Sequence, residues 1–496
     1  MQKNKLKIIR YFSFFVALII FNPLLAQRFT DSPYSRFGIG QIQQKSFAQA
    51  NALGGSHIAL KNDTLLPLFI NVANPASYSS LLLTTFEAGV NSTFNKFSNS
   101  TTTFNSNNTS LNYLAFGFPI RKSMGACFGI MPLSTTGYDV NNYSEVANIG
   151  EIKENYEGNG GINQIFFGTA WKPFSNKFNS YRNSSIYKDE LSGQQFNTIR
   201  EKTFIKRWLS SLSIGGNAYY YFGTINTYSR LIYPDVSNTF NTKLTRQIEM
   251  NAFSGSFGLQ NTFTIAHVKT KEIDTISNSV NYTKRKTREL KEKIELTLGY
   301  TYSLNNSLST TYSEFANTFL YYGFAKNESF RDTVFYNADQ KGSIKLPETH
   351  GIGLSVRKGN HLNILLDVEK QFWSRFSYLN EKNNLQDQNR ISIGAEWVPN
   401  RFANSKSEYL KRIQYRIGGR YNNGYLTIQS TKINDYALSI GLGLPVGANK
   451  LYNTLNLTME LGETASAQKD LIKYNYIKAT VGFTFNDRWF LKYKYD

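Results

Sequence analysis

The residue types that most often carry catalysis or bind metals are scarce in this chain. It has four histidines and one cysteine, and their spacings match none of the short-range pairs that hold zinc. The glycine-rich stretches at 351–356 and 441–447 do not fit a dinucleotide-binding fingerprint and are typical of glycines in strands. We therefore expect no enzyme, metal or cofactor, although a Ser–His hydrolase is an alternative that the sequence leaves open. The histidines and the cysteine are His57, His267, His350, His361 and Cys127.

Some charged residues have a spacing that could bind a ligand. Asp367 and Glu369 fall on one face of a predicted strand, and Arg416 and Arg420 share a face of another. A guanidinium can hold a carboxylate through two parallel hydrogen bonds, so Arg416 and Arg420 are candidates for binding a ligand carboxylate. The alternative, which we favour, is that these charges pair with one another inside a polar lumen.

The elements that must position these residues are strands with apolar side chains on one face. Side chains in a strand point to opposite faces in turn, so segments 455–462, 479–485 and 489–495 each have one apolar side and one small or polar side. We place about 14 to 16 such segments after residue 84, among them 307–322 and 488–495. Each has roughly 10 to 14 residues, the length that a tilted strand needs to cross a bilayer.

The N-terminus favours a membrane barrel over a soluble sandwich. Residues 1–26 have basic residues ahead of an apolar run from Tyr11 to Phe21, which is typical of a secretory signal peptide cleaved after Ala26. No later apolar run reaches the ~18 residues of a spanning helix. Residues 84–496 show no linker, and one cysteine excludes an internal disulfide framework. We predict a transmembrane antiparallel β-barrel in the outer membrane.

The positive charge of the chain lies largely in polar connections between strands. The net charge of +20 falls to +16 without the four basic residues of the leader. Long connections at 173–207, 267–290 and 323–346 contrast with short ones at 447–451 and 487–488. Because such barrels have short periplasmic turns and longer outer loops, we interpret the long connections as outer loops. They would meet anionic lipid headgroups and lipopolysaccharide phosphates, and we expect no nucleic-acid partner.

Residues 27–83 lack the two-residue period and contain scattered glycines, including Gly54 and Gly55. We interpret them as a plug, or hatch, of short helices inside the barrel. Asn74 can cap a short helix whose first turn accommodates Pro75 and Ala76. The apolar residues of this segment are candidates for lining a ligand path, and the alternative is that they pack the lumen shut. They are Leu65, Leu66, Leu68, Phe69 and Ile70.

Two stretches resemble the FadL-type (TodX) outer-membrane transporters of long-chain fatty acids and hydrophobic compounds. Residues 51–81, with Asn74-Pro75-Ala76, are similar to the hatch of that family. Residues 346–376, with Asp367 and Trp373-Ser374, are similar to a late hairpin of its barrel. The resemblance implies a barrel of about 14 strands, a lumen closed by the hatch, and passage of a hydrophobic ligand that leaves sideways through the wall.

Two functions remain as hypotheses. The first is an outer-membrane channel for uptake of hydrophobic small molecules, such as long-chain fatty acids, through a plugged barrel with lateral exit. The second is a structural barrel subunit of an outer-membrane secretion or assembly complex, with other subunits as partners and no transport of its own. The apolar plug favours the first hypothesis, and the long basic connections favour the second.

Overall fold

The structure is a computed structural model that describes most of residues 32–489. Residues 1–31, which include the predicted signal peptide, and 490–496, which include most of the predicted strand at 488–495, lie outside the described part. Internal stretches outside it are 63–67, 101, 148–149, 176–183, 189–194, 200–203, 235–238, 278–282, 306, 323–326, 383–384, 404–405, 429–430, 447–452 and 467–471.

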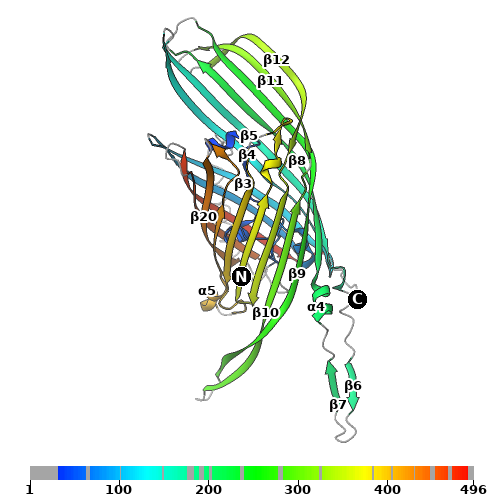
Figure 1. The fold of residues 1–496 in the computed structure, drawn as a ribbon. Helices are drawn as coiled ribbons and strands as arrows, with labels where there is room; N and C mark the ends of the chain where they lie inside the picture. Colours follow the sequence, from blue (N-terminus) through cyan, green and yellow to red (C-terminus); the bar gives the residue numbers. More distant parts are fainter. Residues whose placement is uncertain are drawn as a thin grey trace, which may run out of the picture.

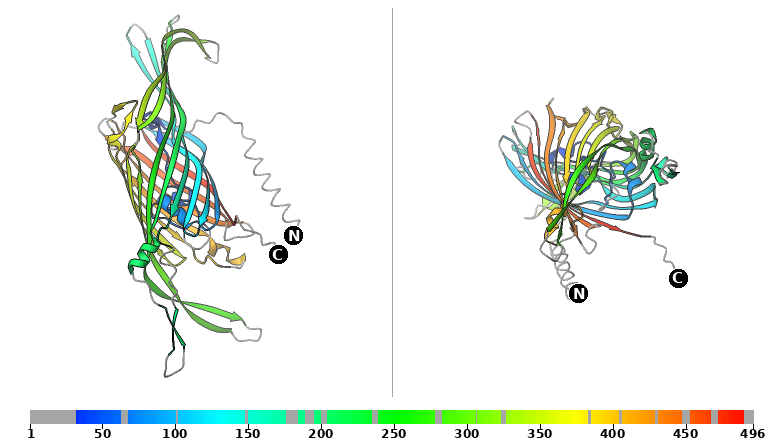
Figure 2. Two further views of the ribbon diagram at one scale, coloured as in Figure 1. Left: turned by 90° about the vertical axis from the view of Figure 1, so that its right-hand side faces the viewer. Right: turned by 90° about the horizontal axis from the view of Figure 1, so that it is seen from below.

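In the described part of the chain, fourteen antiparallel strands pair into a closed ring that forms the wall. Figures 1 and 2 show the wall from three directions. The last strand pairs with the first from Lys473 opposite Ser98 to Asp487 opposite Thr84, which closes the ring. In ring order the strands are β2 (Thr84–Ser98), β3 (Thr103–Arg121), β4 (Met124–Val146), β5 (Gly150–Trp171), β8 (Ser213–Ile232), β9 (Asn241–Ser277), β10 (Thr283–Ser303), β13 (Thr349–Lys358), β14 (Leu362–Gln371), β17 (Gln388–Trp397), β18 (Gln414–Asn422), β20 (Thr431–Val446), β21 (Asn453–Ser466) and β22 (Lys473–Asp487).

Fourteen is the lower end of the predicted range, and the larger count has a structural explanation. The segment 307–322 does form a strand, β11 (Ser307–Tyr322), but it belongs to a hairpin with β12 (Asn327–Lys345). This hairpin pairs with the first part of β9, while β10 pairs directly with β13. Apolar and polar residues alternate in β11 because this hairpin extends the sheet beyond the ring. β11 is not a further strand of the wall.

The outer face of the ring is apolar, as a bilayer requires. On β20, Leu438 is 70% exposed and its neighbour Ser439 is 2% exposed. The same alternation holds on β17, where Ile393 is exposed and Ser392 is buried. Side chains that face outward on these strands are apolar and those that face the lumen are small or polar. No helix in the described part of the chain is long and apolar enough to cross a membrane.

The long connections leave the barrel at both ends. We call the end where β2 begins and β22 ends the terminal end, and the opposite end the outer end. Because the strands alternate in direction, the link from β5 to β8 and the tip of the β9–β10 hairpin project from the terminal end (Figure 1). An even strand count puts both ends of the wall on the periplasmic side. The described parts of 173–207 and 267–290 therefore lie at the end that an even strand count assigns to the periplasm, which contradicts the interpretation of these connections as outer loops from their length alone.

Short elements fill the connections and the hatch. The β5–β8 link contains the hairpin β6 (Ser184–Lys188) and β7 (Gln195–Ile199) and the helix α4 (Phe204–Ser211). The outer end contains η3 (Trp373–Arg375), β15 (Ser377–Tyr378), β16 (Glu381–Lys382) and β19 (Thr427–Ile428), and the terminal end contains η4 (Lys406–Glu408) and α5 (Tyr409–Arg412). The hatch contains η1 (Pro33–Arg36), β1 (Gln41–Ile42), α2 (Ala48–Asn51) and η2 (Pro75–Ser80).

The described hatch, residues 32–62 and 68–83, lies inside the ring and forms the core with the inner wall. Ile39, Phe47 and Tyr78 of the hatch are buried together with Tyr113 and Phe166 of the wall. Phe47 stacks on Tyr113 with ring centroids 3.8 Å apart. This apolar packing closes the middle of the lumen.

Candidate functional site

Asn74 links two parts of the hatch to each other and to the wall. It is the N-cap of η2, where its side-chain oxygen accepts a hydrogen bond from the Ala76 amide at 3.2 Å and Pro75 occupies the first turn. Its side-chain amide donates to the carbonyls of Ile58 at 2.7 Å and Leu259 at 3.3 Å. The predicted cap is confirmed, and the same side chain also fixes the preceding hatch loop to β9.

Gly54 and Gly55 let the hatch lie flat against the wall. Both have positive φ angles, +70° and +77°, which only glycine adopts at low cost. A Cβ atom at Gly54 would lie 2.5 Å from the Gly419 carbonyl oxygen of β18. The Gly54 amide instead donates to the Ser439 hydroxyl of β20 at 2.9 Å.

A carboxylate of β14 holds the next residues of the hatch. One oxygen of buried Asp367 accepts hydrogen bonds from the amides of His57 at 2.6 Å and Ile58 at 2.8 Å. The His57 ring lies between the Gly55 carbonyl, 2.6 Å from Nδ1, and Glu369, 3.9 Å from Nε2. Asp367 and Glu369 therefore both face the lumen, as their spacing predicts, and both contact the hatch.

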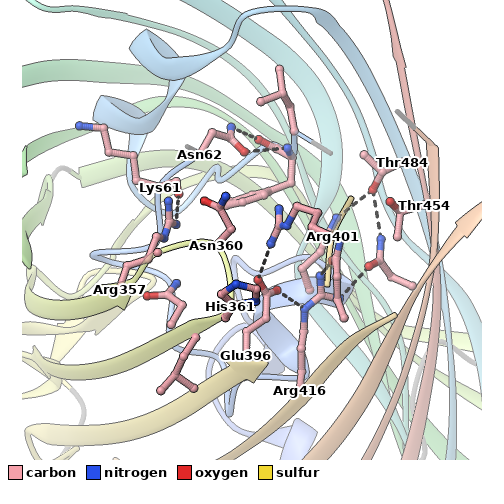
Figure 3. Close-up of a pocket in the computed structure, with 18 residues that line it drawn as sticks. Lys61, Asn62, Arg357, Asn360, His361, Glu396, Arg401, Arg416, Thr454 and Thr484 are labelled. Atoms are coloured by element: carbon pink, nitrogen blue, oxygen red, sulfur yellow. Dashed lines mark hydrogen bonds and ion pairs between the residues drawn. The ribbon is translucent and has the colours of Figure 1, made fainter. Parts of the chain in front are cut away.

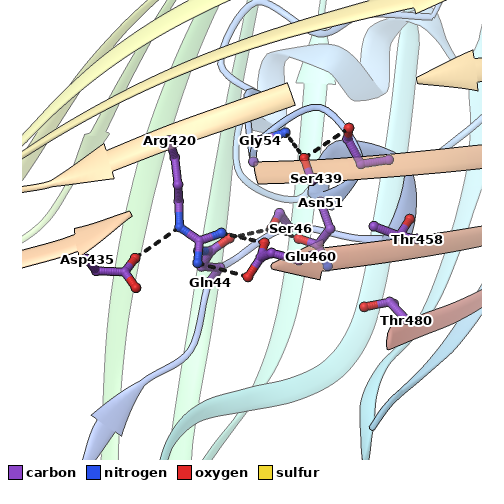
Figure 4. Close-up of polar contacts among 12 residues, drawn as sticks. Gln44, Ser46, Asn51, Gly54, Arg420, Asp435, Ser439, Thr458, Glu460 and Thr480 are labelled. Atoms are coloured by element: carbon purple, nitrogen blue, oxygen red, sulfur yellow. Dashed lines mark hydrogen bonds and ion pairs between the residues drawn. The ribbon is translucent and has the colours of Figure 1, made fainter. Parts of the chain in front are cut away.

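Arg416 is paired with a carboxylate of the neighbouring strand β17, and Arg420 with carboxylates of β20 and β21 on its other side. The Arg420 guanidinium forms two hydrogen bonds with Glu460 and lies 3.2 Å from Asp435 (Figure 4). Arg416 donates to Glu396 at 2.7 Å. The structure therefore contains ion pairs inside the lumen. This is the alternative that we favoured over the binding of a ligand carboxylate.

The hatch divides the lumen into an outer vestibule of about 370 Å³ and an inner pocket of about 50 Å³. The vestibule has a charged floor and an aromatic rim. The floor includes Lys45, His57, Glu369, Arg390 and Arg420, and the rim includes Tyr34, Trp373, Tyr425 and Tyr474. The inner pocket, shown in Figure 3, includes Lys61, Phe69, Arg357, Arg401 and Arg416.

The predicted ligand-binding residues do not converge on one site. Arg420 lines the vestibule, whereas Arg416 and Phe69 line the inner pocket. Ile70 packs in the core of the hatch, and 65–66 lie outside the described residues. Sequence reasoning missed Lys45 and Tyr34, because the hatch has no period from which the direction of a side chain can be read. It also missed Arg390, although the alternation of β17 could have placed this side chain in the lumen.

The wall has a seam between β3 and β4. Their ladder runs only from Arg121 opposite Met124 to Leu114 opposite Ile130, although both strands continue toward the outer end. Along this stretch the edge of β4 pairs instead with β1 of the hatch, where Ile42 lies opposite Ser134. Neighbouring hatch residues extend this contact through hydrogen bonds from Gln43 to Leu133 and from Ser35 to Gly137. We call residues 32–43 the seam segment, because they cover the unpaired edge of β4.

Docking of the hatch is expected to weaken in mild acid. Burial, with the nearby Arg390 guanidinium, lowers the pKa of His57 to about 4, although Glu369 opposes this. A released histidine has a pKa of about 6.5, so the undocked hatch takes up a proton between pH 6.5 and 4 that the docked hatch does not. Once the slower intrinsic exchange in acid is corrected for, the hydrogen-exchange protection of residues 54–60 should fall between pH 7 and 5, and His57→Gln should flatten this dependence. If the pH dependence persists in the His57→Gln variant, it arises from other groups.

Comparisons with known proteins identify the family and the fold. The family model BamG matches residues 8–179 and 264–496, and the sequence matches none of the curated proteins. The Pseudomonas putida toluene transporter TodX has a TM-score of 0.50 at 12% identity, with 90% of this chain and 100% of that chain covered. A Pseudomonas aeruginosa FadL homologue gives 0.49 at 9% identity, covering 91% and 100%, and the CymD monoaromatic hydrocarbon channel gives 0.47 at 12%, covering 91% and 99%.

At these identities the likeness to the solved structures is one of fold, and it confirms the predicted barrel with an N-terminal hatch. The BamG model, in contrast, matches more than half of this sequence. The chain has the fold of the FadL-type transporters and belongs to the BamG family.

Proposed function

We propose that this protein is a hatch-gated outer-membrane channel for hydrophobic small molecules, such as long-chain fatty acids, that leave sideways through the seam. The observation that carries this proposal is that the seam between β3 and β4 is covered on the lumen side by hatch residues. The vestibule is lined by Gln41 and Ile42 of that cover and by Leu133 and Thr135 of β4. Withdrawal of the seam segment would therefore join the vestibule to the wall.

A lateral exit suits an apolar solute. The outer leaflet of lipopolysaccharide is a poor path for such a molecule, but the hydrocarbon core of the bilayer is a favourable one. At the seam, Leu111 and Leu114 of β3 are exposed on the outer face. A ligand that passes between β3 and β4 would meet lipid at once and would not have to cross the packed middle of the lumen.

A disulfide between the seam segment and β4 tests this proposal. Ile42 and Ser134 lie directly opposite each other in an antiparallel pair, a geometry that places Cα atoms about 4.5–5.5 Å apart and suits a disulfide. We expect Ile42→Cys with Ser134→Cys to reduce uptake of labelled oleate to the level of a deletion strain when oxidised. Reduction with dithiothreitol should restore it.

A matched control places the disulfide in the fixed wall. Ser92 of β2 and Thr109 of β3 are also directly opposite and leave the seam unlinked. Oxidised Ser92→Cys with Thr109→Cys should transport like wild type. Full uptake by the oxidised seam variant, in cells whose uptake depends on the protein, would contradict a lateral exit at this seam.

The second candidate function is that of a structural subunit in an outer-membrane assembly. The observation in its favour is the β11–β12 hairpin, which extends the sheet beyond the ring and exposes Phe330, Val334 and Tyr336. Apolar residues in an exposed patch favour a protein contact. Shortening the hairpin by removing 313–340 should then abolish co-purification of a stoichiometric partner from detergent extracts while the ring still folds. Purification of the intact chain alone would contradict this candidate.

A further inference from the structure

The side of the outer vestibule next to the seam is polar. On β2 and β3, every described residue that lines the vestibule carries an amide or a hydroxyl group. The strand register places these side chains in adjacent rows, with Thr93 opposite Asn108 and Asn91 opposite Ser110. An apolar ligand would cover these groups without offering them hydrogen bonds, which costs free energy. We call this side the polar wall, and its residues are Asn91, Thr93, Asn95, Asn108, Ser110 and Asn112.

Asn112 faces the vestibule because β3 has a bulge at this position. Leu111 pairs with Val90 of β2 and Tyr113 pairs with Gly89, so Asn112 is the extra residue between two ladder pairs. A bulge changes the direction in which a side chain points. Asn112 is 4% exposed, and its Nδ2 group has no hydrogen-bond partner in the described part of the chain. Such a buried donor costs free energy unless a bound molecule accepts its hydrogen.

Groups on the other side of the vestibule complete a mixed set of donors and acceptors. Arg390 of β17 is 8% exposed, and its Nη2 donates to the Gly55 carbonyl at 3.1 Å, but its Nε has no partner among the described residues. The Oδ1 of Asn422 on β18 is an acceptor that also has none there. Both residues line the same cavity as Asn112. A hydroxyl group both donates and accepts, whereas a carboxylate only accepts, so a ligand with several hydroxyl groups matches this set.

The charges of the vestibule do not favour a ligand of one sign. Among the described lining residues, four cations are balanced by three carboxylates, and Arg420 contacts both Glu460 and Asp435 (Figure 4). His57 is neutral at pH 7 because its pKa is lowered to about 4. A nearly balanced lining suits an uncharged polar ligand better than an anion. The other charged residues are Lys45, Arg390, Lys478 and Glu369.

The rim adds aromatic faces to this polar lining. Trp373 and Tyr425 stack with ring centroids 3.9 Å apart, and the centroids of Tyr34 and Tyr474 are 6.3 Å apart. The face of an aromatic ring carries partial negative charge and attracts the polarised hydrogens of C–H groups. A sugar ring has C–H groups on its faces and hydroxyl groups around its edge. The vestibule volume of about 370 Å³ is in the range of pockets that bind small molecules.

We propose that the outer vestibule binds a polyhydroxylated ring, that is, a saccharide unit, either free or as the head group of an amphiphile. Asn112 and Arg390 donate to its hydroxyl groups, and Tyr425 stacks against one of its faces. This inference goes beyond the proposed channel, because the saccharide binds in the vestibule whether or not a ligand leaves through the seam.

Calorimetric titration of the chain in phospholipid nanodiscs tests the site without a sugar-based detergent. The probes are maltose for a free saccharide, octyl glucoside for an amphiphile and octanoate for a chain without a sugar, each corrected for partition into protein-free nanodiscs. At least one sugar probe should bind one per chain. Tighter binding of octyl glucoside than of maltose would assign the site to a head group, and the reverse would assign it to a free saccharide. Tighter binding of octanoate than of both sugars would overturn the proposal.

Asn112→Leu separates a contact with the ligand from a structural role. The substitution removes a buried amide that has an unpaired donor, so the melting temperature should stay the same or rise. The affinity for the sugar probe should fall about 2- to 10-fold, the effect of one neutral hydrogen bond. Asn107→Leu, on the exposed opposite face of β3, is the matched control and should bind like wild type.

Tyr425→Leu tests the aromatic contact and keeps the proposal testable if Asn112→Leu does not fold. Loss of the ring face should weaken binding of the sugar probe by a similar factor of about 2 to 10. Lack of binding of both sugars at millimolar concentration would overturn the proposal. Wild-type affinity in the folded Asn112→Leu and Tyr425→Leu variants would overturn it as well.

Discussion

Gly54→Val is expected to release the hatch from the wall and open the lumen to ions. A valine Cβ would lie 2.5 Å from the oxygen and 2.6 Å from the nitrogen of Gly419, and β18 cannot move away because it is paired with β17 and β20. The φ of +70° adds about 1–2 kcal/mol for a residue with a Cβ, and more for a branched one. A valine at position 54 is therefore incompatible with the docked position of the hatch.

Conductance in planar bilayers measures this effect directly. Wild type should be closed or nearly so, and Gly54→Val should show large, long-lived openings while its barrel keeps a high melting temperature. Gly216→Ala is the matched control, because a Cβ there meets its nearest atoms at 3.6 Å, an ordinary contact. Closed Gly54→Val channels would show that the hatch docks without this contact.

Arg420→Met is expected to destabilise the barrel by about 3–5 kcal/mol, the usual cost of removing one partner of a buried ion pair. Glu460 is only 3% exposed and would lose two hydrogen bonds from the guanidinium. Asp435 and the Tyr476 hydroxyl would each lose a contact as well. The free energy of unfolding in urea, measured in detergent micelles, provides the comparison.

Rescue by a second substitution distinguishes two causes of the lower free energy of unfolding, which are an unpaired buried charge and lost packing. Glu460→Gln in the Arg420→Met background should recover at least half of the loss, since no buried carboxylate then remains without its guanidinium. Lys473→Met is the control, because its pair with Glu463 is about half exposed and should contribute under ~1 kcal/mol. Equal losses in the single and double variants would assign the effect to packing.

The wall and part of the hatch could be predicted from sequence because their signals are local. Alternation with period two predicts strands, and the capping chemistry of Asn74 and Pro75 needs only neighbouring residues. The position of a strand in the ring is not local. β11 alternates like a wall strand, and only its partners show that it belongs to the hairpin.

The seam and the two cavities could not be predicted for the same reason. The seam depends on which strand lies beside β4 at Ser134, and the residue found there is Ile42, far away in the sequence. The separation of Arg416 from Arg420 depends on the hatch loop that presses between them at Gly54. Neither arrangement leaves a periodic signal in the chain.

The junction that closes the ring has a consequence for how the protein is made. Gln49 of the hatch donates one hydrogen bond to Glu87 of β2 at 3.1 Å and another to Thr484 of β22 at 2.9 Å. Nearby, Asn486 of β22 donates to the Leu68 carbonyl of the hatch. The hatch thus bridges the first and last strands from inside. If the hatch docks before β22 pairs with β2, these hydrogen bonds would hold the two closing strands side by side from inside the lumen.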